Sequence, residues 1–138
     1  MRLQQQPSTR YPDPYHEAIP GGIRLVIPGY LPPGMNVTFS QHWAVRREAK
    51  QECLLWLRAA AGRDFPRLKR AKIGMVTHRL QVMDKDNLMS SFKFVGDGLV
   101  AMGVLPDDNP DCCEVEVGQV RVAHRELIKT VIEIRGVE

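Results

Sequence analysis

The stretch DKDNLMSSFKFVGDGLVAMGVLPDD, residues 84–108, is the most strongly patterned part of this 138-residue chain. At 100° per residue its apolar side chains fall on one narrow face, as those of an amphipathic helix do. Asp86 or Asn87 is expected to cap the start of that helix. The stretch therefore predicts a helix that packs one side against a core. The apolar stripe consists of Leu88, Phe92, Val95, Leu99 and Met102.

The opposite face of this predicted helix is charged. Lys93 and Asp97 lie within about 40° of Asp86, and the pair Asp107 and Asp108 follows the helix end. Carboxylates gathered without a cation repel by about 4 kcal/mol per close pair at an effective dielectric near 20. Mg²⁺ removes that cost, and it favours one or two carboxylates with waters and phosphate oxygens. The pattern therefore predicts a Mg²⁺ site that faces a phosphate.

The same residues resemble a family signature. The string D-x-D-N-L, then S-S-x-K, then D-G-L-x-x-x-G-V-x-x-D-D, which runs from Asp84 to Asp108, is similar to that of the RusA family of Holliday junction resolvases. Upstream, the segment from Pro32 to Asn36 resembles the Pro-Pro-x-x-Asn segment of that family. The resemblance extends from about Gly22 to the C-terminus.

This resemblance implies a homodimeric, Mg²⁺-dependent endodeoxyribonuclease with no organic cofactor, in which Mn²⁺ is an alternative metal. Its partner would be branched DNA, and it would resolve four-way junctions by paired symmetric nicks in DNA recombination and repair. Such proteins are typically encoded by phages and prophages. By the same resemblance, Asp84, Asp86 and Asp108 are the catalytic metal ligands and Lys93 is the catalytic lysine.

Lys93 departs from the shortest family members, because residues 89–92 lengthen the spacing and rotate it relative to Asp86. We expect its side chain to lean toward the helix N-terminus and reach the metal site. Asp97 is placed either to pair with Lys93 at i, i+4 or to support the site. The residues expected to surround the site are Asn36, Asn87, Asp97 and Asp107, of which Asn87 has helix capping as its simpler role.

Charge is distributed unevenly along the chain. The net charge of +3 is too small to indicate nucleic-acid binding. Residues 46–72, however, hold nine basic and three acidic side chains, whereas residues 105–118 hold five acidic and no basic ones. A basic lobe beside an acidic edge suits a protein that grips phosphates near a metal. The residues expected to contact DNA are Arg46, Lys50, Arg67, Lys69, Arg70 and Lys72.

The remaining pattern predicts an α+β fold, in which a mixed β-sheet carries two main helices. Residues 1–21 are expected to form a mobile arm, and residues 22–138 the endonuclease domain. Strands are expected near residues 23–27, 72–83, 113–122 and 130–135. In the second of these, Val76, Leu80 and Val82 alternate and should deliver Asp84 at the strand end.

A long helix is expected over residues 40–61, and Gly62 should end it. Both tryptophans, Trp43 and Trp56, are expected in the core. The buried stripe of this helix should comprise Val45, Ala49, Cys53, Trp56 and Ala60.

Cysteine usage and hydropathy suggest a cytoplasmic protein of a phage or its bacterial host, with no membrane partner. Three cysteines are an odd number, and Cys112 and Cys113 are adjacent, which does not suit a disulfide framework. No long apolar run or cleavable signal is evident.

Two other functions compete with the endonuclease. Leu80 to Asp86 also resembles the nucleophile strand of haloacid-dehalogenase-type phosphatases. Only 52 residues follow Asp86, however, too few for the repeating βα units of that fold. A DNA-junction-binding protein without activity is the second alternative, because sequence does not establish the geometry of a site.

Overall fold

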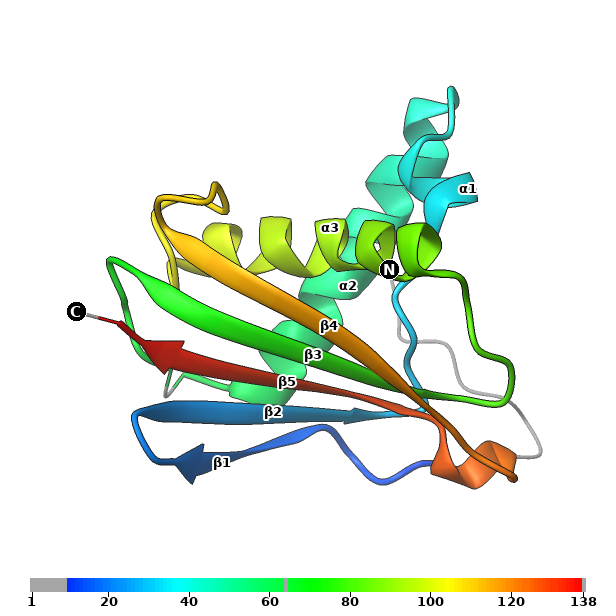
Figure 1. The fold of residues 1–138 in the computed structure, drawn as a ribbon, viewed down its shortest axis with the longest axis horizontal. Coiled ribbons are helices and arrows are strands. Elements are labelled where there is room, and N and C mark those ends of the chain that lie inside the picture. The colour runs from blue at the N-terminus through cyan, green and yellow to red at the C-terminus, as the bar shows by residue number, and fades with distance from the viewer. Residues whose placement is uncertain (1–9, 64, 138) are drawn as a thin grey trace.

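Five strands and two long helices make up the computed structural model, which describes residues 10–63 and 65–137 (Figure 1). The sheet has the order β1-β2-β5-β3-β4, and α2 and α3 cover one of its faces. The predicted α+β architecture with a mixed sheet is confirmed. In chain order the elements are β1 (Tyr15–Ile19), β2 (Gly22–Pro28), α1 (Met35–Thr38), α2 (Trp43–Ala61), β3 (Ala71–Arg79), α3 (Lys85–Met102), β4 (Cys113–Arg121), the 3-10 turn η1 (Arg125–Leu127) and β5 (Lys129–Gly136).

The helix α3 connects the parallel strand pair. Strands β3 and β4 are parallel, whereas the pairs β1·β2, β2·β5 and β3·β5 are antiparallel. Parallel neighbours need a long crossover, which is usually a helix packed on the sheet. The predicted apolar stripe of α3 is buried as expected: Leu88, Phe92, Val95, Leu99 and Met102.

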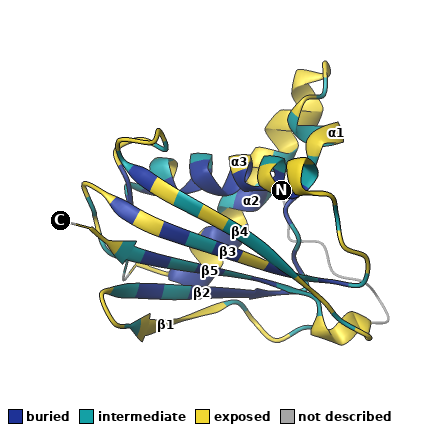
Figure 2. Ribbon diagram, viewed as in Figure 1, coloured by how far each residue is buried: buried dark blue, intermediate teal, exposed yellow. Residues whose placement is uncertain are grey.

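The helix α2 is buried only in its second half. Cys53, Trp56 and Ala60 lie in the core, as predicted. Val45 is 43% exposed and Trp43 is 62% exposed, so their predicted burial is wrong. The reason is geometric, because the first turns of α2 extend past the sheet and past α3 (Figures 1 and 2).

The residues of β3 that face the core differ from the predicted alternation. Its buried side chains are the odd-numbered ones, including Ile73 and Met75, while Val76 and Val82 are exposed. The strand also ends at Arg79, before the position that would deliver Asp84 directly. Apolar residues occupy both faces of β3, so the alternation alone does not decide which face is buried. The helices cover the odd-numbered face and thereby select it.

The segment predicted as a mobile arm contains a strand. Residues Tyr15–Ile19 form β1, which pairs antiparallel with β2 at one edge of the sheet. Arg24 in β2 binds Glu17 in β1 and Glu133 in β5, with N–O distances of 2.8 Å and 2.7 Å. The sheet therefore begins before the predicted boundary at residue 22. The rest of the predicted arm, residues 1–9, lies outside the described residues.

Cys53, Cys112 and Cys113 are free thiols. In the described part of the chain, none of the helices has the length and apolarity needed to cross a lipid bilayer.

The register of β3 leads to a testable difference between neighbouring positions. Met75→Ala should lower the free energy of unfolding by about 2–5 kcal/mol, because Met75 is fully buried. Val76→Ala should cost less than about 1 kcal/mol, because Val76 is 36% exposed. Urea unfolding of both variants measures the difference. Equal losses of unfolding free energy in the two variants would contradict the burial of Met75 and the exposure of Val76.

Candidate active site

The start of α3 is capped by Asp84. Its Oδ1 accepts a hydrogen bond from the backbone N–H of Asn87 at 2.8 Å, and its backbone is extended. The prediction that Asp86 or Asn87 caps the helix is therefore wrong. A carboxylate at this position satisfies a free N–H and interacts favourably with the helix dipole. One oxygen of Asp84 is thus already used by the helix.

Asn87 instead joins two segments that are far apart in the sequence. Its Oδ1 accepts a hydrogen bond from the backbone N–H of Met35 at 2.7 Å, at the start of α1. Thr38 at the other end of α1 donates from its hydroxyl to the carbonyl of Ser90 at 3.3 Å. The segment that follows Pro32 and Pro33 is therefore fastened along the first turns of α3. Asn36 lies in this segment and is exposed.

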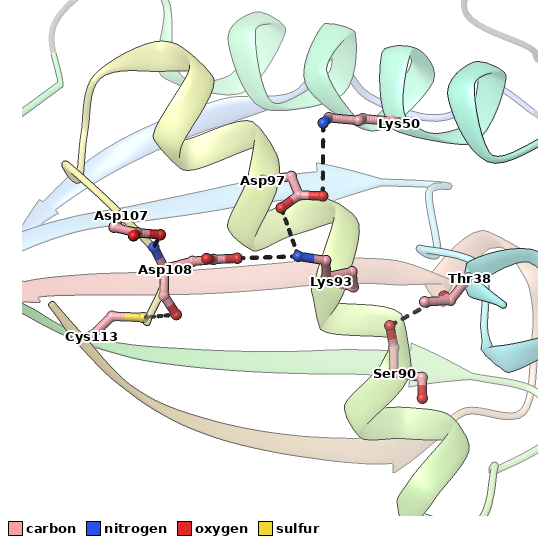
Figure 3. Close-up of polar contacts among 8 residues, drawn as sticks. All are labelled: Thr38, Lys50, Ser90, Lys93, Asp97, Asp107, Asp108 and Cys113. Carbon is pink, nitrogen blue, oxygen red and sulfur yellow. Dashed lines mark hydrogen bonds and ion pairs between the residues drawn. The ribbon is translucent and has the colours of Figure 1, made fainter. Parts of the chain in front are cut away.

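Four charged side chains meet on the polar side of α3, and we call them the lysine–aspartate cluster: Lys50, Lys93, Asp97 and Asp108 (Figure 3). The ammonium of Lys93 lies 3.0 Å from Asp97 Oδ1 and 3.7 Å from Asp108 Oδ2. Lys50 Nζ reaches Asp97 Oδ2 from α2 at 3.9 Å. Three separate elements therefore contribute to one group: α2, α3 and the loop that follows α3.

Two glycines on either side of Asp97 allow these elements to approach. A Cβ on Gly96 would lie 3.2 Å from Asp108 Oδ2, and a Cβ on Gly98 would lie 2.4 Å from Leu57 Cδ1 of α2. Larger side chains at these positions would push away the loop or the helix. A glycine inside a predicted helix can indicate that another element approaches closely. The sequence does not say which element that is.

Electrostatics keep Lys93 charged. The hydrogen bond with Asp97 raises the pKa of Lys93, Asp108 adds to that increase, and partial burial opposes it. The Lys93 side chain is still 54% exposed, so these ion pairs contribute little stability. Lys93 is directed to Asp97 one turn later, and not toward the helix N-terminus as predicted, because the acid at i+4 attracts it.

The two adjacent aspartates after α3 have different roles. Asp107 Oδ1 accepts from the backbone N–H of Asp108 at 2.7 Å, and its Oδ2 accepts from Asn109 Nδ2 at 3.0 Å. Asp107 therefore braces its own loop. Asp108 is the one that faces Lys93, and it also lines a pocket of about 530 Å³ together with Arg70.

The three aspartates predicted to bind the metal lie apart in the structure. Asp84 and Asp86 precede Lys93 by about 13 Å and 10 Å along the helix axis, at 1.5 Å per residue. Asp108 instead approaches the middle of α3, beside Gly96. Oxygens that share one Mg²⁺ at about 2.1 Å must lie within roughly 4 Å of each other. Among residues 10–63 and 65–137, no three His, Cys, Asp or Glu side chains are grouped to hold a metal ion.

The predicted DNA-contacting residues are spread over two regions. In α2, Arg46 donates to the carbonyl of Ser40 at 2.6 Å, next to Lys50 of the cluster. The remaining positions belong to the segment before β3 or to its start. There Arg67 packs over the Phe65 ring at 5.7 Å, Lys69 and Arg70 are exposed, and Lys72 lies 3.8 Å from Glu114.

The fold argues against the phosphatase alternative. That family uses a nucleophile at the end of a strand in a parallel, doubly wound sheet. Here only β3 and β4 are parallel, and Asp84 caps a helix five residues after β3 ends.

Comparisons with known proteins leave the family open. No family model matches the chain, and no curated protein matches it. Among solved structures, the chain is similar to a protein from Shewanella oneidensis MR-1 described as a "putative endoribonuclease". The identity is 13%, the match covers 99% of this chain and 91% of that one, and the TM-score is 0.45. A likeness at this level does not assign a function.

The link between Asn87 and α1 can be tested. Asn87→Ala removes the acceptor for the Met35 amide and should cost about 1 kcal/mol of stability. Asn87→Asp keeps an oxygen there and serves as the matched control. Amide hydrogen exchange should show faster exchange at Met35 in the alanine variant only. Unchanged protection in Asn87→Ala would show that another group holds α1.

Proposed function

We propose that this chain is a metal-dependent endonuclease that acts on branched DNA, as the RusA-family resemblance implies. The observation that supports this most is the lysine–aspartate cluster, in which the ammonium of Lys93 faces both Asp97 and Asp108 on an accessible surface. Carboxylates beside an exposed, protonated lysine are suited to bind a cation and a phosphate together.

The carboxylates of the cluster pair with Lys93 and Lys50, and they would exchange those contacts for Mg²⁺. Asp97 and Asp108 supply two carboxylates, which is the number that Mg²⁺ commonly takes from protein. Asp107 has both oxygens in hydrogen bonds of its own loop, and Asp84 and Asp86 lie about 10 Å or more from Lys93 along the helix axis. The proposal therefore assigns the metal to Asp108 and Asp97, with Mn²⁺ as an alternative ion. When bound, the metal would polarise the scissile phosphate and lower the pKa of an attacking water.

The side chains of the chain itself would do the remaining work. Lys93, which is protonated at neutral pH, would neutralise charge that develops on the phosphate oxygens. Lys50 and Arg46 on α2, and Arg70 beside Asp108, would hold the DNA backbone without reading its sequence. A homodimer with two-fold symmetry would place equivalent sites on opposed strands of a four-way junction.

A DNA-junction-binding protein without catalysis is the second candidate. It is favoured by the lack of a group of three metal-binding acids among the described residues. Such a protein would use the same basic residues and would leave the phosphodiester intact.

One experiment separates these functions. Purified protein is incubated with synthetic four-way junctions, forks and linear duplex, with and without Mg²⁺. Paired nicks on junctions that require Mg²⁺ support the endonuclease. Binding to junctions without cleavage in either Mg²⁺ or Mn²⁺ indicates the non-catalytic alternative, and no preference for branched DNA contradicts both.

The identity of the metal ligands gives a sharper prediction. Asp108→Asn and Asp97→Asn should each lower the cleavage rate by about 10²-fold or more, because each removes a ligand charge. Asp107→Asn should have a smaller effect, since Asp107 braces its loop. Asp84→Asn and Asp86→Asn distinguish two candidate sets of metal ligands: the acids of the lysine–aspartate cluster and the three aspartates implied by the resemblance. Loss of cleavage in both, with Asp97→Asn active, would return the metal to Asp84, Asp86 and Asp108.

Lys93 is tested by single-turnover cleavage under saturating enzyme and Mg²⁺. As a group that acts on the transition state, its removal in Lys93→Ala should slow cleavage by about 10²-fold or more with little change in junction affinity. Lys85→Ala is the matched control, because Lys85 is an exposed lysine at the start of the same helix and lies outside the lysine–aspartate cluster. A Lys93→Ala rate within about threefold of the parent would show that Lys93 only balances charge.

A further inference from the structure

An exposed aromatic and basic surface lies at the start of α2, outside the lysine–aspartate cluster. Phe39, which follows α1, is 66% exposed, and Trp43, which begins α2, is 62% exposed. Figure 2 shows this region as almost entirely exposed, on the part of the molecule that extends beyond the sheet. Exposed apolar patches that are rimmed by polar residues mark interaction sites.

Basic side chains accompany these rings. The guanidinium of Arg47 lies 5.8 Å from the centre of the Trp43 ring. Arg46 is held nearby through its hydrogen bond to the carbonyl of Ser40. A flat aromatic ring beside guanidinium groups matches a nucleobase and its phosphate, because bases stack on aromatic rings while arginine binds the backbone. A purely apolar protein partner would gain nothing from this positive charge.

The same helix face leads from the aromatic surface to the cluster. At 100° per residue, Arg46, Arg47 and Lys50 all lie within about 60° of Trp43. Lys50 contacts Asp97 of the cluster, and Trp43 lies about 10 Å from Lys50 along the helix axis. Phe39 is four residues before Trp43, so their Cα atoms are at most about 15 Å apart.

We infer that Phe39 and Trp43 stack on unpaired DNA bases next to the cluster, with Arg46 and Arg47 binding the adjoining phosphates. This rests on the proposed function and names the part of a branched substrate that the chain recognises: the unpaired bases at or near the branch point. The surface would favour forks, flaps and opened junctions over continuous duplex, whose bases are already stacked.

The test measures binding without cleavage. Fluorescence anisotropy follows a labelled oligo(dT) and a matched duplex in EDTA, so that the result does not depend on nuclease activity. Phe39→Ala and Trp43→Ala should each weaken oligo(dT) binding about tenfold or more, and Trp43→Phe should retain most of the affinity. Val45→Ala is the matched control, because Val45 is also exposed but lies about 160° from Trp43 around the helix.

A second measurement uses tryptophan fluorescence. Trp43 is exposed and Trp56 is buried, so oligo(dT) should quench emission in the parent and not in Trp43→Phe. Equal oligo(dT) affinity in all variants would overturn the proposal, even where junction cleavage is observed. Shielding of Trp43 from acrylamide on raising the protein concentration alone would also overturn it, and would make this surface an interface between copies of the chain. If Phe39 and Trp43 contribute to oligo(dT) binding but junctions are not cleaved, only the proposed endonuclease function is contradicted.

Discussion

The structure depends on the burial of one side of α3 against the sheet. This helix links the parallel strands β3 and β4, so its apolar stripe must face the sheet for those strands to pair. Val95 and Leu99 in the stripe are fully buried. Once that side is fixed, the helix period forces Lys93 and Asp97 onto the accessible side.

Loop and helix packing then decide which acids accompany Lys93. The chain after α3 turns back along the helix, and the small side chain of Gly96 leaves room for Asp108. On the other side, Gly98 faces Leu57 and brings α2 close enough for Lys50 to reach Asp97. A helix is a rigid spacer, so Asp84 and Asp86 at its first turn are kept about 10 Å or more from Lys93.

The helix α2 has two parts with different surroundings. Its second half packs Cys53, Trp56 and Leu57 into the core. Its first half extends past both α3 and the sheet, so Trp43 is exposed on a helix whose later tryptophan is buried. The buried stripe of α2 therefore serves folding, whereas Trp43, about 160° from Val45 around the helix, shares a basic face with Arg47 and Lys50. That face provides the surface proposed to bind unpaired bases.

The sequence by itself determined the fold class, the apolar stripe of α3, the strand β2 and the end of α2 at Gly62, because these follow from periodicity and local backbone preference. It also marked Lys93, Asp97 and Asp108 as charged residues near one helix. Only the tertiary structure decided that Asp84 caps α3 and that Asn87 binds the Met35 amide. It likewise decided that Met75 and not Val76 faces the core. These outcomes depend on which segments meet in space, and the local pattern of residues at each position was compatible with more than one of them.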